Sequence, residues 1–252
     1  MLSDLVELNV FGFFLIFARI GSAVATFPGF SSSFVSPRFA LAIGLGISFV
    51  VMAPLLPLLP VMPTSIAALS LLLMGEILIG VFFGTIARVL VSTLQTAGTI
   101  IAYAASLANA MINDAVSEQQ SSTISSFLLT MGLVLIFVSD MHHLMIIAVI
   151  DSYSLFVPGE GLMIEDMAFF LTRKVGDSFA LALQLSAPFL IVAMTYYIGL
   201  GLLGRLMPQL QVFFFGMPFQ LGVQIWVLVI TTSGIMMVFM EYFRDSFITF
   251  AL

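Results

Sequence analysis

Long apolar runs separated by short polar stretches dominate the hydrophobicity pattern of this chain. We read six runs that approach the length of about 20 mainly apolar residues needed to cross a bilayer as a helix. They cover roughly residues 8 to 27, 39 to 53, 66 to 90, 124 to 150, 178 to 204 and 218 to 240. Because no internal repeat or linker separates them, the pattern predicts an all-α, polytopic membrane protein with a single domain over residues 1-252.

Prolines mark the predicted ends and bends of these runs. Four of them recur every third residue after the second run, at Pro54, Pro57, Pro60 and Pro63. This spacing suits an extended polyproline-like segment and ends a helix. Pro188 predicts a kink in the fifth run. Pro208 predicts a helix stop and lies within a predicted connection over residues 204 to 217. Pro218 is predicted to start the last helix.

Composition supports the membrane assignment and excludes several classes of function. Hydrophobic residues make up 61% of the 252 residues and charged residues only 8%. The net charge of -6 argues against nucleic-acid binding, which needs clustered basic residues. The absence of cysteine excludes disulfides and thiolate metal sites. Asp4 and Glu7 stand where a secretory signal carries basic residues, so we expect no cleaved signal peptide.

The distribution of basic residues does not favour either orientation of six alternating spans in the membrane. One side of the membrane would receive Arg38, Arg88 and Arg205, and the other side Arg173, Lys174 and Arg244. Ordinary membrane proteins show a clear excess of basic residues on the cytoplasmic side. The equal number of basic residues on the two sides indicates that the chain does not cross the bilayer as a simple six-helix bundle.

The segment from residue 92 to 123 is rich in Ala, Ser, Thr, Asn and Gln, although it lies between apolar runs. Such a segment does not suit contact with lipid, and irregular backbone at membrane depth has to be covered by protein or line a wet cavity. Two interpretations remain open. The segment is either a solvated loop with a helical start, or a re-entrant or pore-lining segment with Met111 and its neighbours in the passage.

Two charged residues lie inside apolar runs, where an ionised side chain costs about 3 kcal/mol or more. Glu76 needs a partner or water, and Arg19 is expected to pair inside an assembly. Gly80 and Gly84 are four residues apart and therefore share one helix face, which permits close helix packing. We interpret this region as a packing face with a satisfied glutamate; an ion pathway is the alternative.

His142 and His143 follow Asp140 and invite a metal-site interpretation. Neighbouring residues on a helix project about 100° apart, whereas zinc needs convergent ligands, typically at i, i+4. The sequence therefore predicts a hydrogen-bonding pair and no metal site.

Residues 160 to 177 mix apolar and charged side chains at helical spacing, which predicts a surface helix that carries many charges.

The chain shows no nucleophile, base and orienting residue in a catalytic pattern, and no glycine-rich phosphate loop. We therefore predict that it is not an enzyme and uses no cofactor. A polytopic secondary transporter or ion channel, with Glu76 and Asp140 as ion-coupling carboxylates, is an alternative function.

The segment GLLGRLMPQLQVFFFGMPFQ, residues 201 to 220, carries a resemblance to a known family. Arg205 and the residues after it are similar to the R-x-x-P-Q-x-x-V-F-x-x-G-x-P signature of the FliR/SctT family of type III secretion export subunits. Further similar stretches are ARIGSAVATFPGFSSSFVSPRFALAIGLG, GEILIGVFFG, HHLMI and LSAPFL. The resemblance covers nearly the whole chain, and its motifs are specific only in combination.

The resemblance implies bent helical hairpins, with a FliP-like part over about 1-177 and a FliQ-like part over about 178-252. It implies a subunit of the flagellar export gate that assembles with FliP and FliQ and contacts FlhB. Unfolded flagellar proteins would be the substrates. The expected location is the bacterial inner membrane, in contact with lipid, within the flagellar basal body and projecting to the periplasmic side.

The resemblance also implies roles for individual residues. A plug in the loop near 106-122 would include Leu107, Asn109, Met111, Ile112 and Asn113. Assembly or packing residues would be Arg19, Glu76, Gly80, Gly84, His142, His143, Arg205, Pro208, Gln209, Phe213, Gly216 and Pro218.

Overall fold

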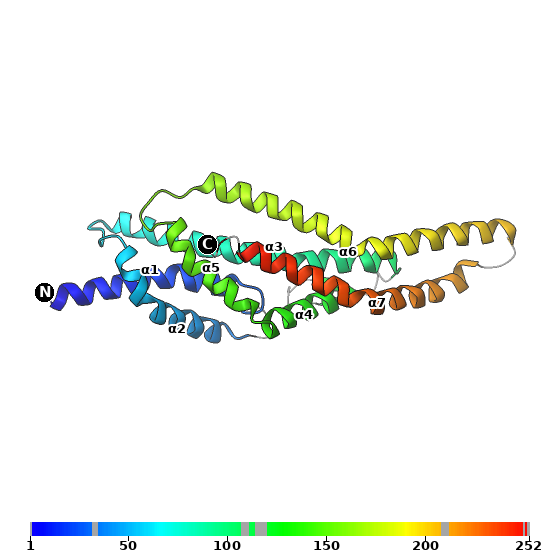
Figure 1. Ribbon diagram of the computed structural model, residues 1–252, viewed down its shortest axis with the longest axis horizontal. Helices are drawn as coiled ribbons and strands as arrows, with labels where there is room; N and C mark the ends of the chain where they lie inside the picture. Colours follow the sequence, from blue (N-terminus) through cyan, green and yellow to red (C-terminus); the bar gives the residue numbers. More distant parts are fainter. Residues whose placement is uncertain are drawn as a thin grey trace. The chain divides into compact units, whose positions relative to one another are not determined.

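The computed structural model describes residues 2–31, 35–106, 111–113, 120–207, 212–248 and 250, and within these the side chains of residues 2–9, 111–113, 120, 121, 212–215 and 217 are left undescribed. Figure 1 shows a chain built almost entirely from helices. The α-helices of the described residues are α1 Leu2–Thr26, α2 Pro37–Leu55, α3 Ile66–Ala104, α4 Thr123–Val138, α5 Met141–Leu155, α6 Ile164–Leu206 and α7 Val212–Ile248. The prediction of an all-α membrane protein is confirmed.

Two short elements complete the described structure. The 3-10 turn η1, Leu56–Leu58, follows α2 where the repeated prolines begin. The strands β1, Met111–Asn113, and β2, Gln120–Ser122, pair antiparallel between α3 and α4, with Met111 opposite Ser122. This hairpin falls inside the segment that the sequence marks as polar and unsuited to lipid.

The described helices include four that are long and apolar enough to span a membrane: Pro37–Leu58 (α2 with η1), Ile66–Ala104, Ile164–Leu206 and Pro218–Ile248. The pair α4 and α5 adds a fifth span if it is counted as one, although the pair is bent by 72°. The apolar part of α1, Val10–Thr26, is shorter than these. The run predicted over residues 124 to 150 is therefore not one straight helix.

The bend between α4 and α5 lies at Asp140. Its backbone has a φ of 57°, in the left-handed region that a continuing right-handed helix cannot contain. Asp and Asn visit this region more readily than other non-glycine residues because their short polar side chains bond locally. The predicted run over residues 124 to 150 crosses this break, although the polar stretch from Ser139 to His143 interrupts the apolar pattern there.

Three other helix boundaries differ from the sequence prediction. Helix α3 continues through residues 92 to 104 as a regular helix. The predicted surface helix at 160 to 177 is the first part of the 43-residue helix α6, which also contains Pro188. Helix α7 begins before Pro218, so this proline lies inside the helix and does not start it.

The charged residues at the ends of α6 suit its helix dipole. Glu165 and Asp166 lie in the first turn, and Arg205 lies in the last turn.

The chain divides into two compact units. The first unit comprises residues 1–90, 136–175 and 243–252, and the second comprises residues 91–135 and 176–242. Fully buried side chains of the first unit include Leu15, Ile16, Phe83, Ile86, Phe243 and Phe247, and those of the second include Leu94, Leu128, Phe189 and Phe239. The predicted boundary between a FliP-like and a FliQ-like part near residue 177 stays a prediction.

Candidate functional site

A buried ion pair joins α1 to α3 in the first unit. The Arg19 side chain is 0% exposed and the Glu76 side chain 2%. Arg19 Nε donates a hydrogen bond to Glu76 Oε2 at 2.6 Å, and Nη2 donates one to Oε1 at 3.0 Å. Both carboxylate oxygens are thus occupied by one guanidinium in a bidentate pair, the strongest common form of this interaction. The sequence predicted that Glu76 needs a partner and that Arg19 pairs inside an assembly; in the structure the two residues pair with each other within one chain.

Helix α5 supplies the remaining partners of Arg19. Nη1 donates to the hydroxyl of Ser152 at 3.1 Å, and Nη2 donates to the carbonyl oxygen of Phe156 at 2.8 Å. The guanidinium carbon also lies 3.8 Å from the centre of the Tyr153 ring, within the range of a cation–π interaction. Arg19 therefore ties three helices together, and a buried charge with this many partners does not need a water pathway.

The two glycines beside Glu76 allow α3 to approach α1 closely. A Cβ added at Gly80 would overlap the Ser22 hydroxyl and the Arg19 carbonyl oxygen, and one at Gly84 would overlap the Thr26 side chain. One turn further along α3, Arg88 Nε donates to the Thr26 carbonyl at 2.7 Å, at the end of α1. The structure thus brings together Arg19, Glu76, Gly80 and Gly84 on one helix contact, as the packing interpretation requires.

The predicted plug segment lies in the second unit. Leu107 and Asn109 lie outside the described residues, and Met111, Ile112 and Asn113 form β1, of whose side chains nothing is described. The two ends of the segment are described in full. They show how the hairpin is attached to the helices around it.

The first end of the segment is held by α6 and α7. Gln220, 3% exposed, donates from Nε2 to the carbonyl of Ala104 at 2.7 Å and to the Tyr197 hydroxyl at 3.1 Å. The Ser106 hydroxyl, on a residue with a φ of 62°, lies 3.3 Å from the Tyr197 hydroxyl and donates to Gln220 Oε1 at 3.4 Å. Gln220 therefore satisfies the last carbonyl of α3 and anchors the start of the hairpin.

The second end of the segment is held against α3. Ser122 Oγ accepts a hydrogen bond from the backbone N–H of Ser125 at 3.1 Å, and Ser125 Oγ donates to the Gln95 carbonyl at 2.9 Å. A Cβ at Gly98 would overlap the backbone of Ser125. This close packing against α4 explains why α3 stays helical through its small polar residues.

The signature segment near residue 205 is described in part. Arg205 is exposed in the last turn of α6, and Pro218 is exposed inside α7. Gly216 is buried, and its carbonyl accepts a hydrogen bond from the Tyr196 hydroxyl at 2.5 Å. Pro208 and Gln209 lie outside the described residues, as does the side chain of Phe213.

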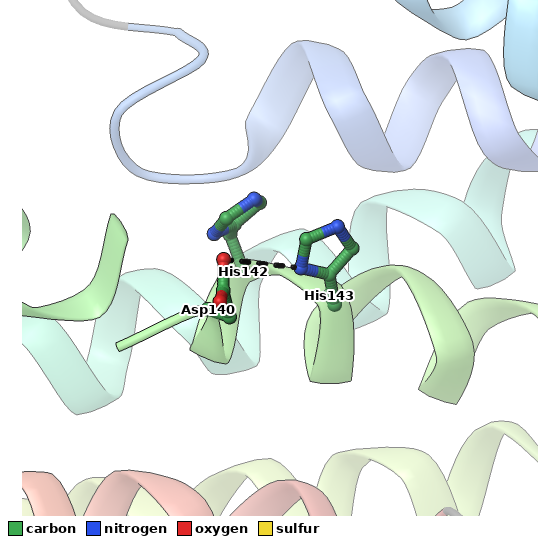
Figure 2. A group of neighbouring side chains, drawn as sticks. All are labelled: Asp140, His142 and His143. Atoms are coloured by element: carbon green, nitrogen blue, oxygen red, sulfur yellow. Dashed lines mark ion pairs between the residues drawn. The ribbon is translucent and has the colours of Figure 1, made fainter. Parts of the chain in front are cut away.

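The paired histidines lie at the start of α5, directly after the break at Asp140 (Figure 2). The rings of His142 and His143 are 4.1 Å apart between centres, and His143 Nδ1 lies 3.7 Å from Asp140 Oδ1. The expectation that the two histidines diverge is therefore wrong. The left-handed residue changes the direction of the chain, and the three side chains converge on one side of the turn.

Sequence reasoning missed Gln220, Tyr197 and Ser106. Gln220 was visible as a polar residue in an apolar run, which usually requires a buried hydrogen-bond partner. Gln220 did not stand out as a single buried polar residue, because residues 201 to 220 contain two more glutamines and an arginine. No local pattern identified Tyr197 or Ser106, since their contacts join residues about 90 or more positions apart.

Comparison with known proteins gives a consistent family. The family model described as "Bacterial export proteins, family 1" matches residues 10–246. The chain is 32% identical over 232 residues to the flagellar biosynthetic protein FliR of Caulobacter vibrioides, covering 92% of each chain. It is 29% identical over 208 residues to FliR of Escherichia coli, covering 82% of this chain and 78% of that one.

A protein named for the translocation of Yop proteins is also similar. The Yop proteins translocation protein T of Yersinia pestis is 27% identical over 238 residues, covering 91% of this chain and 89% of that protein. Together with the apolar spans and the signature near Arg205, these matches indicate a membrane component of flagellar type III export. The chain belongs to family 1 of the bacterial export proteins, the FliR/SctT family.

Proposed function

We propose that this chain is a structural and gating subunit of the flagellar type III export channel, which forms with FliP and FliQ the gate for unfolded flagellar proteins. FlhB would contact this complex. The complex would lie in the bacterial inner membrane, within the basal body, and project to the periplasmic side. The observation that carries the gating role is the doubly anchored hairpin between α3 and α4.

The hairpin has the attachment that a movable plug needs. Its ends are fixed at Ser106 by Gln220 and at Ser122 by the turn into α4. Among the described residues of this segment, pairing is through two three-residue strands. An isolated hairpin of this size is marginally stable. Passing substrate can therefore displace it at small cost, while the helices that hold its ends stay folded.

Apolar side chains at such a constriction resist ions by excluding water. Met111 and Ile112 are the apolar residues of β1, and Met111 pairs with Ser122 at the second anchor. Methionine suits this role because its flexible thioether repacks around different partners. The same flexibility lets one gate accept many unfolded sequences.

Exposed apolar faces on α6 and α7 support membership in a larger membrane assembly. On α6, large apolar side chains recur at helical spacing at Ile191, Met194, Ile198 and Leu202, each more than half exposed. On α7, Trp226, Val229, Ile230 and Met237 are about 70% exposed. Faces of this size are covered by lipid or by other subunits. FliP and FliQ are the proposed protein partners.

The transporter or channel alternative loses its main support at Glu76. An ion-coupling carboxylate has to face its ion, whereas both oxygens of Glu76 accept hydrogen bonds from Arg19. The pairing of Glu76 therefore favours a gate subunit over a transporter that uses this carboxylate to couple ions.

Replacing residues 107–121 by a short Gly-Ser linker tests the gating role while Ser106 and Ser122 remain as anchors. Cells carrying this variant with FliP and FliQ should assemble the complex and show a raised ion conductance across the inner membrane. The Thr172→Ala variant, which changes an exposed residue of α6 and keeps the hairpin and both anchors, should conduct no more than the unaltered protein. Unchanged conductance in an assembled linker variant would refute the plug, whereas failure to co-purify with FliP and FliQ would refute the assembly.

A further inference from the structure

The turn between α4 and α5 places three metal-ligating side chains together. One ligand atom each from Asp140, His142 and His143 lies within 4.8 Å of the other two. We propose that these three residues bind a divalent transition-metal ion, with zinc as the ion that their donor atoms suit best. The ion would join the break in the helix pair to the first turn of α5.

The donor atoms select the class of metal. Two imidazoles and one carboxylate are the ligands of many zinc sites, and three protein ligands leave a fourth position for water. Calcium and magnesium prefer all-oxygen sites, so the two histidines disfavour them. The absence of cysteine makes the site unsuited to metals that require thiolate ligands.

The spacing of the ligand atoms requires only side-chain rotation to reach bonding geometry. Two ligands on a tetrahedral zinc, each about 2.1 Å from the metal, lie about 3.4 Å apart. His143 Nδ1 and Asp140 Oδ1 are already 3.7 Å apart. Their side chains are 62% and 79% exposed, so no packing opposes a small rotation. The helix itself does not have to move.

The third ligand, His142, is held in place by its surroundings. Its ring stacks on Phe137 at 5.0 Å between centres, and Phe137 in turn packs edge-on against Phe30 at 5.4 Å. Gly29, with a φ of 89°, lacks the Cβ that would overlap the Phe137 ring. A ligand whose orientation is fixed by packing binds metal with less loss of side-chain entropy.

His142 also brings an unsatisfied nitrogen to the cluster. Its Nδ1 is shielded from solvent and has no hydrogen-bond partner among the described residues. A buried polar atom without a hydrogen-bond partner is energetically unfavourable. Metal ligation through this atom would remove the cost directly. Ligation through Nε2 would favour the tautomer in which Nδ1 carries the proton.

Copper provides a specific spectroscopic test, because it binds nitrogen and oxygen sites more tightly than zinc does. The chain contains only two histidines and no cysteine, so in a tag-free preparation imidazole signals report on this pair alone. Purified full-length protein with one equivalent of Cu²⁺ should show pulsed-EPR modulation from the remote nitrogens of two imidazoles. His142→Gln and His143→Gln should each show one imidazole, and the double variant none.

Zinc binding is then measured by calorimetry on the same preparation. We expect one ion per chain, with affinity reduced at least about tenfold by Asp140→Asn or by either histidine substitution. Glu165→Gln, which removes an exposed carboxylate at the start of α6, should leave the affinity unchanged. A copper spectrum of the unaltered protein without imidazole modulation would overturn the proposal even if the variants fail to fold. Equal zinc binding by a folded double-histidine variant would overturn it as well.

Discussion

Glu76 in α3 and Arg19 in α1 neutralise each other inside the first unit, although 57 positions separate them in the sequence. The pair is bidentate, and Ser152 and the Phe156 carbonyl bind the remaining face of the guanidinium. Removing one partner leaves a buried charge without compensation, whereas removing both leaves a neutral site. This asymmetry yields the first prediction.

Glu76→Gln should destabilise the protein by about 3 to 5 kcal/mol, because Arg19 would remain charged and buried. The double variant with Arg19→Met and Glu76→Leu should be more stable than the Glu76→Gln variant. Thermal unfolding in detergent, followed by the fluorescence of the single tryptophan, Trp226, provides the measurement. Equal stability of the unaltered protein and the Glu76→Gln variant would show that the ion pair contributes nothing.

Gly80→Ala and Gly84→Ala should each destabilise the contact between α1 and α3 by about 1 to 3 kcal/mol, because the new methyl group overlaps atoms of α1. Gly46→Ala is a matched control within α2, since an added Cβ there meets nothing within 4 Å. The control should be neutral or stabilising by up to about 1 kcal/mol, as alanine favours a helix. Equal unfolding temperatures for all three variants would show that the close approach of α3 to α1 does not contribute to stability.

Gln220→Leu should loosen the hairpin more than it destabilises the rest of the protein. It removes the donor to the Ala104 carbonyl and the acceptor for Ser106, at a cost of about 1 to 3 kcal/mol. Limited proteolysis should cut residues 105–122 faster in this variant.

Gln224→Leu is the matched control for Gln220→Leu. Gln224 lies one turn further along α7, is also buried, and donates to the Phe189 carbonyl at 3.1 Å. Its loss should reduce stability by a similar amount without changing cleavage of the hairpin. Equal cleavage rates in the two variants would contradict the anchoring role of Gln220.

Replacing Arg205, Pro208 and Gln209 together by alanine should reduce co-purification with FliP and FliQ. Arg205 is an exposed charge at the end of a membrane-spanning helix, where an exposed polar group needs a partner or water. Arg173→Ala, which removes another exposed arginine of α6, is the control and should leave co-purification unchanged. Full recovery of both partners with the triple variant would exclude an assembly role for this segment.

The sequence predicted the existence of the helices better than their ends. Apolar runs locate membrane helices reliably because lipid contact imposes the pattern directly. At Asp140 a short polar stretch does interrupt an apolar run, but the bend itself depends on one backbone angle that the pattern does not specify. The continuation of α3 past residue 92 depends on contacts with α4 at Gly98 and Gln95, which local composition does not reveal.

The sequence showed which residues of the candidate site require a partner, but not which residues they contact. Burial energetics required partners for Arg19 and Glu76, and they turned out to be each other. The choice between partners depends on how distant helices pack, which a single sequence does not state. The approach of Asp140 to His142 and His143 was hidden for a related reason, because regular helix geometry fails at Asp140, two residues before His142.

The last described residue of the chain lies in the middle of an aromatic cluster. Phe250 packs edge-on against Phe83 and Phe170, each at 5.1 Å between ring centres. Phe83 belongs to a helix made early in translation and is fully buried. The early and the last parts of the chain therefore share one aromatic core, so this part of the first unit can complete its packing only after residue 250 has been synthesised.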